Sequence, residues 1–85
     1  MLITHSRPMG TISVAVQVNP DGVKLTRNGS SSLDVPFSYD KAVKDLTRWA
    51  GGALIQDACG DWDITWREWL ITGIEPGDDL NPIFH

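Results

Sequence analysis

The chain has 85 residues, a single cysteine and a net charge of −4. This length fits one small domain, whose core buries only a modest share of the chain's surface. One cysteine excludes an internal disulfide and a multi-cysteine zinc motif. No segment approaches the ~20 apolar residues that span a bilayer, and the opening residues lack the apolar run of a secretion signal. The sequence therefore predicts a soluble cytoplasmic protein.

The charge is unevenly distributed along the chain. Residues 1–32 carry a balance of +2, and residues 33–56 are neutral. Residues 57–85 carry seven acidic side chains against Arg67 alone, a balance of −6. An acidic surface repels nucleic-acid phosphates and suits a basic protein partner. The alternative is a structural role, in which the acids cap helices and keep the surface solvated.

Alternating side chains predict a β-hairpin in the N-terminal part. In residues 11–18, β-branched side chains alternate with small or polar ones, and the alternation resumes in residues 23–27. Such a period of two is typical of half-buried strands. Between them, Asn19-Pro20-Asp21-Gly22 supplies a turn, since proline presets φ and glycine accepts the unusual backbone angles of a tight reversal.

Two further strands are predicted beside this hairpin. Residues 33–37 alternate again, but Pro36 cannot donate to a ladder, so this strand should be short and lie at a sheet edge. Residues 2–4 would add a fourth short strand, followed by a loop over residues 5–9. These elements place the sheet in roughly the first 37 residues.

The next segment has the periodicity of an amphipathic helix. Ser38 or Asp40 can cap its first turn. Its apolar residues recur at intervals of three and four, which places them on one face: Ala42, Val43, Leu46, Trp49 and Ala50. We expect the intervening charged side chains to stay in water: Lys41, Lys44, Asp45 and Arg48. Gly51-Gly52 should end or sharply kink the helix, before a short helical piece over residues 53–58.

A last regular helix is expected over residues 64–72. Asp63 is a suitable N-cap, and Gly73 is well placed to end the helix in the left-handed conformation. Trp66, Trp69 and Leu70 share one face, which Ile64 and Ile71 flank. We expect Trp69 to pack against Trp49 over the sheet, and an apolar hook, Ile83 and Phe84, to return to the core.

These elements predict an α+β fold: a small antiparallel sheet, made of the hairpin and an edge strand, packed by two main helices and the C-terminal apolar hook. The chain should form one domain over residues 1–85. Residues 1–37 would be mainly strands and residues 38–85 mainly helical.

The C-terminal half contains three short motifs that point to a family. They are G-x-x-I-Q-x-A at residues 52–58, R-E-x-L-I-T-G-I-x-P at residues 67–76, and I-F at residues 83–84. In these motifs the chain resembles a group of small proteins encoded by tailed phages and prophages, related to zinc-ribbon-like domains. The resemblance covers about half of the chain and brings no catalytic residues with it.

The resemblance also concerns zinc. Many members of that group look like zinc-binding proteins, with C-x-x-C-G near the N-terminus and a second C-x-x-C after T-G-I. The corresponding positions here are residues 6–10 and residues 75–78, which contain no cysteine. The resemblance therefore implies a version that has lost the metal and folds without it, so we expect no metal site and no cofactor.

Candidate reactive groups in this sequence favour structural roles. His5, Cys59 and His85 are scattered and lack metal-ligand spacing, and the two histidines should be solvated. Cys59 lies among tryptophans, which favours a buried small apolar side chain over a nucleophile. Arg67 should form an ion pair or hydrogen bond that fixes the last helix against the acidic tail.

Protein binding is the function that the sequence favours. Four tryptophans are many for so small a core, and aromatic residues are enriched at interface centres. The candidate partner-binding residues, called the acidic docking residues below, are Asp61, Trp62, Asp63, Glu75, Asp78 and Asp79. We expect a non-enzymatic, phage-type accessory protein in the host bacterial cytoplasm that binds and inhibits a basic host protein, such as an anti-phage nuclease complex.

Two alternatives stay open at this point. One is a small structural or assembly component of a phage particle. The other is a nucleic-acid-binding module of zinc-ribbon descent, which would use Arg7, Lys24 and Arg27. The sequence disfavours the second, because the hairpin offers few cations and no aromatic side chains on which bases could stack.

Overall fold

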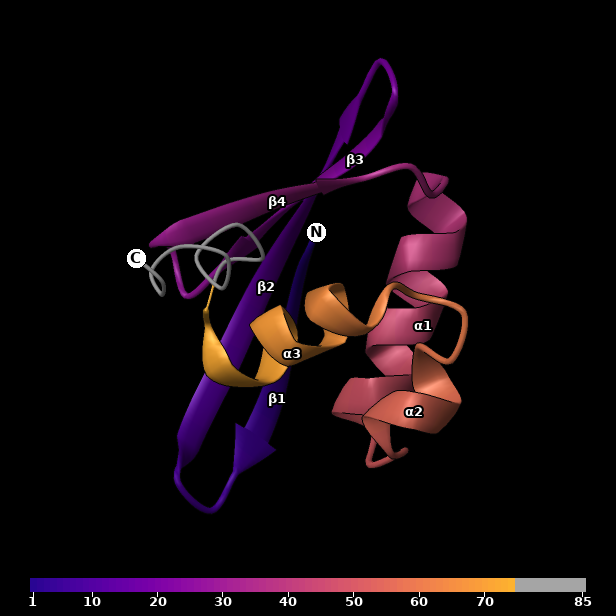
Figure 1. Ribbon diagram of the computed structural model, residues 1–85. Coiled ribbons are helices and arrows are strands. Elements are labelled where there is room, and N and C mark those ends of the chain that lie inside the picture. Colours follow the sequence, from indigo (N-terminus) through magenta and orange to yellow (C-terminus); the bar gives the residue numbers. More distant parts are fainter. Residues whose placement is uncertain (75–85) are drawn as a thin grey trace, which may run out of the picture.

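A computed structural model describes residues 1–74 and shows a four-stranded sheet packed by helices (Figure 1). The strands are antiparallel and lie in the order of the chain: β1 (Leu2–Arg7), β2 (Gly10–Asn19), β3 (Gly22–Arg27) and β4 (Ser31–Val35). The helices follow them: α1 (Tyr39–Ala50), α2 (Ile55–Ala58) and α3 (Ile64–Thr72). The α+β class expected from the sequence is confirmed. The expected apolar hook, Ile83 and Phe84, lies outside the described residues.

The predicted hairpin is formed by β2 and β3. Their register runs from Val14↔Arg27 to Asn19↔Gly22, which leaves Pro20 and Asp21 as the turn. Glycine is required after this turn, because a Cβ at residue 22 would collide with the carbonyl oxygen of Val35. The turn residues thus also determine how closely the end of β4 approaches β3.

Strand β1 is longer than the sequence predicted. It pairs with β2 from Leu2↔Ala15 to Arg7↔Gly10, so the predicted loop over residues 5–9 is wrong. A tight turn at Pro8 and Met9 replaces it. His5 explains the difference, because its side chain faces the helices and its ring packs on Trp49 with 4.5 Å between centroids. The expectation that His5 is solvated is therefore also wrong, since it is half-buried.

Strand β4 lies at an edge of the sheet, as Pro36 predicted. It begins two residues before the predicted strand and ends at Val35, so Pro36 follows it rather than interrupting it. Its register with β3 runs from Val23↔Val35 to Arg27↔Ser31. Ser31 therefore points to the same side of the sheet as Val35, the side that the helices cover.

One face of the sheet forms the floor of the core. Its buried side chains are Ile3, Ile12, Val14, Val16, Val23, Leu25 and Val35. Val18 belongs to the same alternation but is 68% exposed. Strand β1 reaches only as far as Ala15 of β2, so Val18 has no neighbour on that side, whereas its register partner Val23 lies between β2 and β4 and is fully buried. Burial near this end of β2 therefore depends on the neighbouring strands.

Helix α1 begins and ends as the sequence predicted. The Ser38 hydroxyl accepts a hydrogen bond from the Lys41 amide, and Gly51 follows the last helical residue. Ala42, Leu46 and Trp49 are buried against the sheet. One assignment was wrong: Asp45, expected in water, is only 6% exposed. Its partners are Lys41 of the same helix and Trp62 from a later segment of the chain, and they are described below.

Helix α3 is capped at both ends. Asp63 accepts a hydrogen bond from the Thr65 amide, and Gly73 ends the helix in the left-handed conformation with φ 82°, both as predicted. Arg27 of β3 adds a further cap, because its guanidinium donates to the carbonyl oxygens of Leu70 and Ile71 at 2.8 and 2.9 Å. Cations at the C-terminal end of a helix also interact favourably with its dipole.

Trp49 and Trp69 occupy one core but contact different strands. Both are buried, at 3% and 0% exposure. The Trp49 ring packs on His5 of β1, whereas the Trp69 indole donates to the Ser31 hydroxyl of β4 at 3.1 Å. Among the described residues the two indoles do not form an aromatic pair, so their predicted direct contact is not confirmed. They instead anchor the helices at opposite edges of the sheet.

Candidate functional site

Asp61 and Asp63, two of the acidic docking residues, lie on the surface and interact within the chain. A carboxylate oxygen of Asp61 is 2.7 Å from the Lys41 ammonium, and this hydrogen bond lowers the pKa of Asp61. Asp63 accepts from both the amide and the hydroxyl of Thr65, which lowers the pKa of its carboxyl. Both carboxylates therefore have structural roles, while their exposure leaves them accessible to a partner.

Trp62 cannot serve as an exposed contact in this structure. Its side chain is 3% exposed, and its indole N–H donates to Asp45 Oδ2 at 2.9 Å. The assignment of Trp62 to a docking surface is therefore corrected to the core. The turn that carries Trp62 follows α2 and folds back onto α1. The local sequence pattern does not reveal this arrangement. Glu75, Asp78 and Asp79 lie outside the described residues.

Asp45 is the centre of a small polar network between α1 and the 61–62 segment. The same oxygen that accepts from Trp62 lies 2.8 Å from the Lys41 ammonium, which also reaches Asp61. These hydrogen bonds raise the pKa of Lys41. The ammonium also lies 5.0 Å from the centre of the Phe37 ring, whose other neighbours include the Trp62 indole. Burial of Asp45 is thus compensated by two donors.

The sequence analysis missed an apolar surface on the outer side of α3. Ile64 is 61% exposed, and Ile74, just after the helix, is 53% exposed. Ile64 and Ile71 are seven residues apart and lie on the face opposite Trp69. A hollow of about 250 Å³ runs along this face. It is lined by Ile55, Gln56, Ile64, Arg67, Glu68 and Ile71.

Arg67 is the half-buried cation of α3. Its Nε atom is buried, and no hydrogen-bond acceptor among residues 1–74 reaches it. The expected contact with the acidic tail falls outside the described residues. The structure does show that Arg67 lines the same hollow as Ile64 and Ile71.

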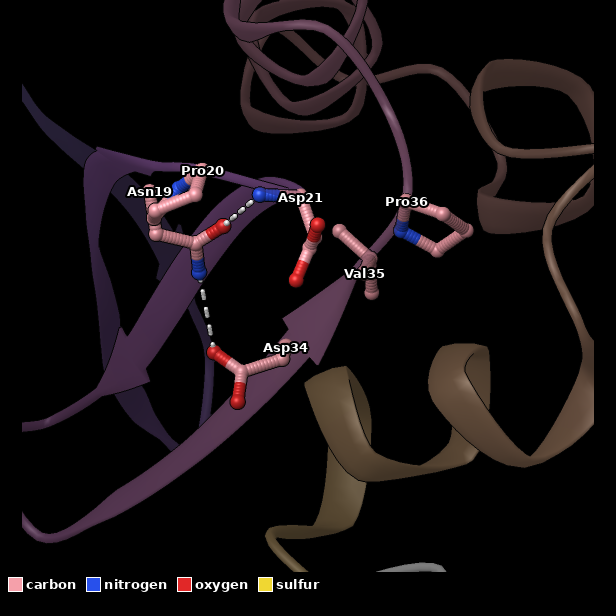
Figure 2. A pocket seen from close by; sticks show the side chains of 6 residues that line it. All are labelled: Asn19, Pro20, Asp21, Asp34, Val35 and Pro36. Atoms are coloured by element: carbon pink, nitrogen blue, oxygen red, sulfur yellow. Dashed lines mark hydrogen bonds between the residues drawn. The ribbon is translucent and has the colours of Figure 1, made fainter.

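A second hollow, of about 400 Å³, lies beside the β2–β3 turn (Figure 2). Asn19 organises it, because its Oδ1 accepts from the Asp21 amide and its Nδ2 donates to Asp34 Oδ1 at 3.2 Å. Figure 2 shows these side chains joining the turn to β4. The polar groups are thus used to hold the turn in place, and we assign this hollow a structural role.

The three cations of the nucleic-acid alternative do not converge on one surface. The Arg27 guanidinium is committed to the end of α3, and burial is the main cause that lowers its pKa. Lys24 pairs in register with Gln17 and Asp34, on the opposite face of the sheet from Arg27. One nucleic-acid strand could not place its phosphates on Lys24 and on Arg27 at the same time.

Cys59 is buried, as expected, and is the free cysteine of this chain. Burial is the main cause that raises the pKa of its thiol, to about 12. Because the thiolate is the nucleophilic form, Cys59 is unreactive at neutral pH while the domain stays folded. Across residues 1–74, no three side chains of His, Cys, Asp or Glu gather in a way that could hold a metal ion.

The longest described helix, α1, has 12 residues, and no helix within residues 1–74 is long and apolar enough to cross a membrane. Comparison of the sequence with protein-family models, with curated proteins and with solved structures found no match.

Proposed function

We propose that this domain is a non-enzymatic accessory protein of phage type that binds a basic host protein in the bacterial cytoplasm and blocks it, for instance a component of a defence nuclease complex. The observation that carries the proposal is the outer face of α3. The helix buries Trp69 and Leu70 against the sheet, yet its opposite side also carries isoleucines, of which Ile64 is mostly exposed.

A helix with apolar side chains on both faces is usually covered on both faces. Within residues 1–74, Ile64 and Ile74 are mostly exposed, and a protein partner would remove them from water. Each fully buried side chain of this type contributes roughly 1.5–3 kcal/mol. These isoleucines would then form the apolar centre of the interface, the role that the sequence analysis gave to Trp62.

The charges around this face favour a basic partner. Asp61, Asp63 and Glu68 are exposed in the segment that forms and precedes α3. Residues 1–74 contain seven basic and eight acidic side chains, so three of the four net negative charges belong to residues 75–85, directly after this face. Acidic groups at the rim of an apolar centre would speed association with a basic surface.

Replacing Ile64 with aspartate should weaken binding to the partner at least tenfold and leave the fold intact. The side chain is 61% exposed, so the domain loses little on substitution, whereas an interface would have to bury a charge. A pull-down from bacterial lysate identifies the partner, and calorimetry with the purified protein measures the change. Val18→Asp is the matched control, because Val18 is 68% exposed on the distant hairpin. Equal losses in both variants would contradict an interface on α3.

Charge reversal at Asp61, Glu75, Asp78 and Asp79 should slow association with the same partner and reduce its salt dependence. The melting temperature should change little, since exposed charges contribute little to stability. Stopped-flow measurements at several salt concentrations test this. Reversal of Asp21 and Asp40, which are exposed and are not among the docking residues, serves as the control. If that pair slows association as much, attraction comes from net charge alone and the C-terminal acids are not the docking surface.

A further inference from the structure

Two neighbouring hollows lie where the β1–β2 turn meets the helices. One, of about 360 Å³, is lined by Arg7, Arg27 and Ile71 among others. The other, of about 350 Å³, is lined by Arg7, Leu54 and Ile71 among others. Arg7 and Ile71 line both, and we call the two together the arginine hollow. It lies beside the turn at Pro8 and Met9, at the lower end of the sheet in Figure 1.

The arginine hollow carries positive charge that the described residues do not neutralise. Residues 1–74 contain eight acidic side chains, but none of them lines either part of it. Arg7 is exposed and forms no ion pair within residues 1–74. Its charge also acts on Arg27, whose pKa is lowered by burial first and by Arg7 second. Two neighbouring guanidinium groups repel each other, and an anionic group placed between them would remove that repulsion.

The walls of the arginine hollow combine polar groups with apolar side chains. Ile71 lines both parts, Leu54, which is 61% exposed, lines one of them, and Met9, which is 96% exposed, lines the other. Methionine side chains adapt readily to different apolar partners. Nucleic acid would instead need exposed aromatic rings for its bases, and the indole in this wall, Trp49, is 3% exposed. The lining therefore suits a peptide that combines carboxylates with apolar side chains.

We propose that the arginine hollow binds an acidic segment of a partner protein, with a carboxylate of that segment on Arg7 and an apolar side chain against Ile71. Arginine presents a planar set of donors that matches a carboxylate with two parallel hydrogen bonds. The site contains none of the acidic docking residues and does not require the basic host partner proposed above, although Ile71 also lines the hollow on the outer face of α3.

The test uses the whole protein and a fluorescein-labelled peptide of alternating glutamate and leucine. Fluorescence anisotropy should show saturable binding that weakens with salt, and the methyl signals of Ile71 should shift in NMR spectra. Arg7→Glu should weaken this binding about tenfold, as expected for the loss of one charge-assisted hydrogen-bonded contact. Its thermal melt should match the wild type, because Arg7 is exposed.

Lys24→Glu is the matched control, since it makes the same charge change on the uncovered face of the sheet. It should bind the peptide almost as well as the wild type. Equal weakening in both variants would overturn the proposal, because net charge would then explain the binding. Equally tight binding of a lysine–leucine peptide would also overturn it. A third result would overturn it as well: the protein binds a labelled oligonucleotide and not the acidic peptide, and Arg7→Glu abolishes the oligonucleotide binding.

Discussion

Replacing Trp69 with alanine should destabilise the domain by about 3–5 kcal/mol. The side chain is completely buried, and its indole N–H joins α3 to Ser31 of β4. Alanine would leave a cavity beneath the helix and remove this hydrogen bond. A domain of this length has a free energy of unfolding of about 4–13 kcal/mol. The variant would therefore lose a large part or all of its stability. Chemical denaturation followed by far-UV circular dichroism measures the loss.

Two control variants test whether the loss of stability is specific to Trp69. Trp66→Ala removes a half-buried indole from the same helix, which meets the Phe37 ring edge-on at 5.7 Å, and should cost about 1–2 kcal/mol. Trp69→Phe keeps most of the apolar contact and loses only the hydrogen bond to Ser31. If Trp66→Ala and Trp69→Ala proved equally damaging, Trp69 would not be at the centre of the core.

Features of this fold that depend on neighbouring residues could be predicted from the sequence. The β2–β3 hairpin follows from alternation on both sides of a Pro-Asp-Gly turn. The ends of the helices follow from Ser38, Asp63 and Gly73, each of which acts within a few residues of its own position. Pro36 indicated an edge strand because proline lacks the amide that a central strand needs.

Features that depend on distant partners could not be predicted in this way. Arg27 was a candidate for nucleic-acid contact because it is one of the few cations of the hairpin, yet its guanidinium caps a helix 43 residues later. His5 was placed in a loop because its partner, Trp49, belongs to a helix that follows the whole sheet. In each case the deciding contact joins residues whose pairing no local pattern specifies.

The candidate site illustrates the same limit. The acidic residues were visible in the composition, but their use within the chain, as in the pairing of Asp61 with Lys41, was not. Trp62 was favoured as a contact residue because it lies in a turn between helices, where side chains are usually exposed. A signal for the α3 outer face was present, since Ile64 and Ile71 are seven residues apart and lie opposite Trp69 at helical periodicity, not beside the tryptophan face as the sequence analysis placed them. This spacing became informative only once the structure showed that the sheet covers the Trp69 side of α3.

Replacing Asp45 with alanine should cost about 2–3 kcal/mol. The variant leaves the buried indole N–H of Trp62 without an acceptor, and an unsatisfied buried donor costs roughly 1–3 kcal/mol. It also removes one of the two carboxylates at the Lys41 ammonium, whose side chain is 34% exposed and can recover some hydration. The loss should therefore stay below the roughly 3–5 kcal/mol of a fully buried broken ion pair.

Asp45→Asn and Asp61→Asn separate the two contributions. The asparagine oxygen at position 45 can still accept from Trp62, so this variant should retain most of the stability that alanine loses. Asp61→Asn removes only an exposed ion pair and should change the unfolding midpoint little. Urea denaturation gives the free energies of unfolding, and the NMR shift of the Trp62 indole proton reports its hydrogen bond. If Asp45→Ala is no less stable than Asp61→Asn, the buried contact with Trp62 does not hold α1 to the 61–62 segment, and apolar packing alone must do so.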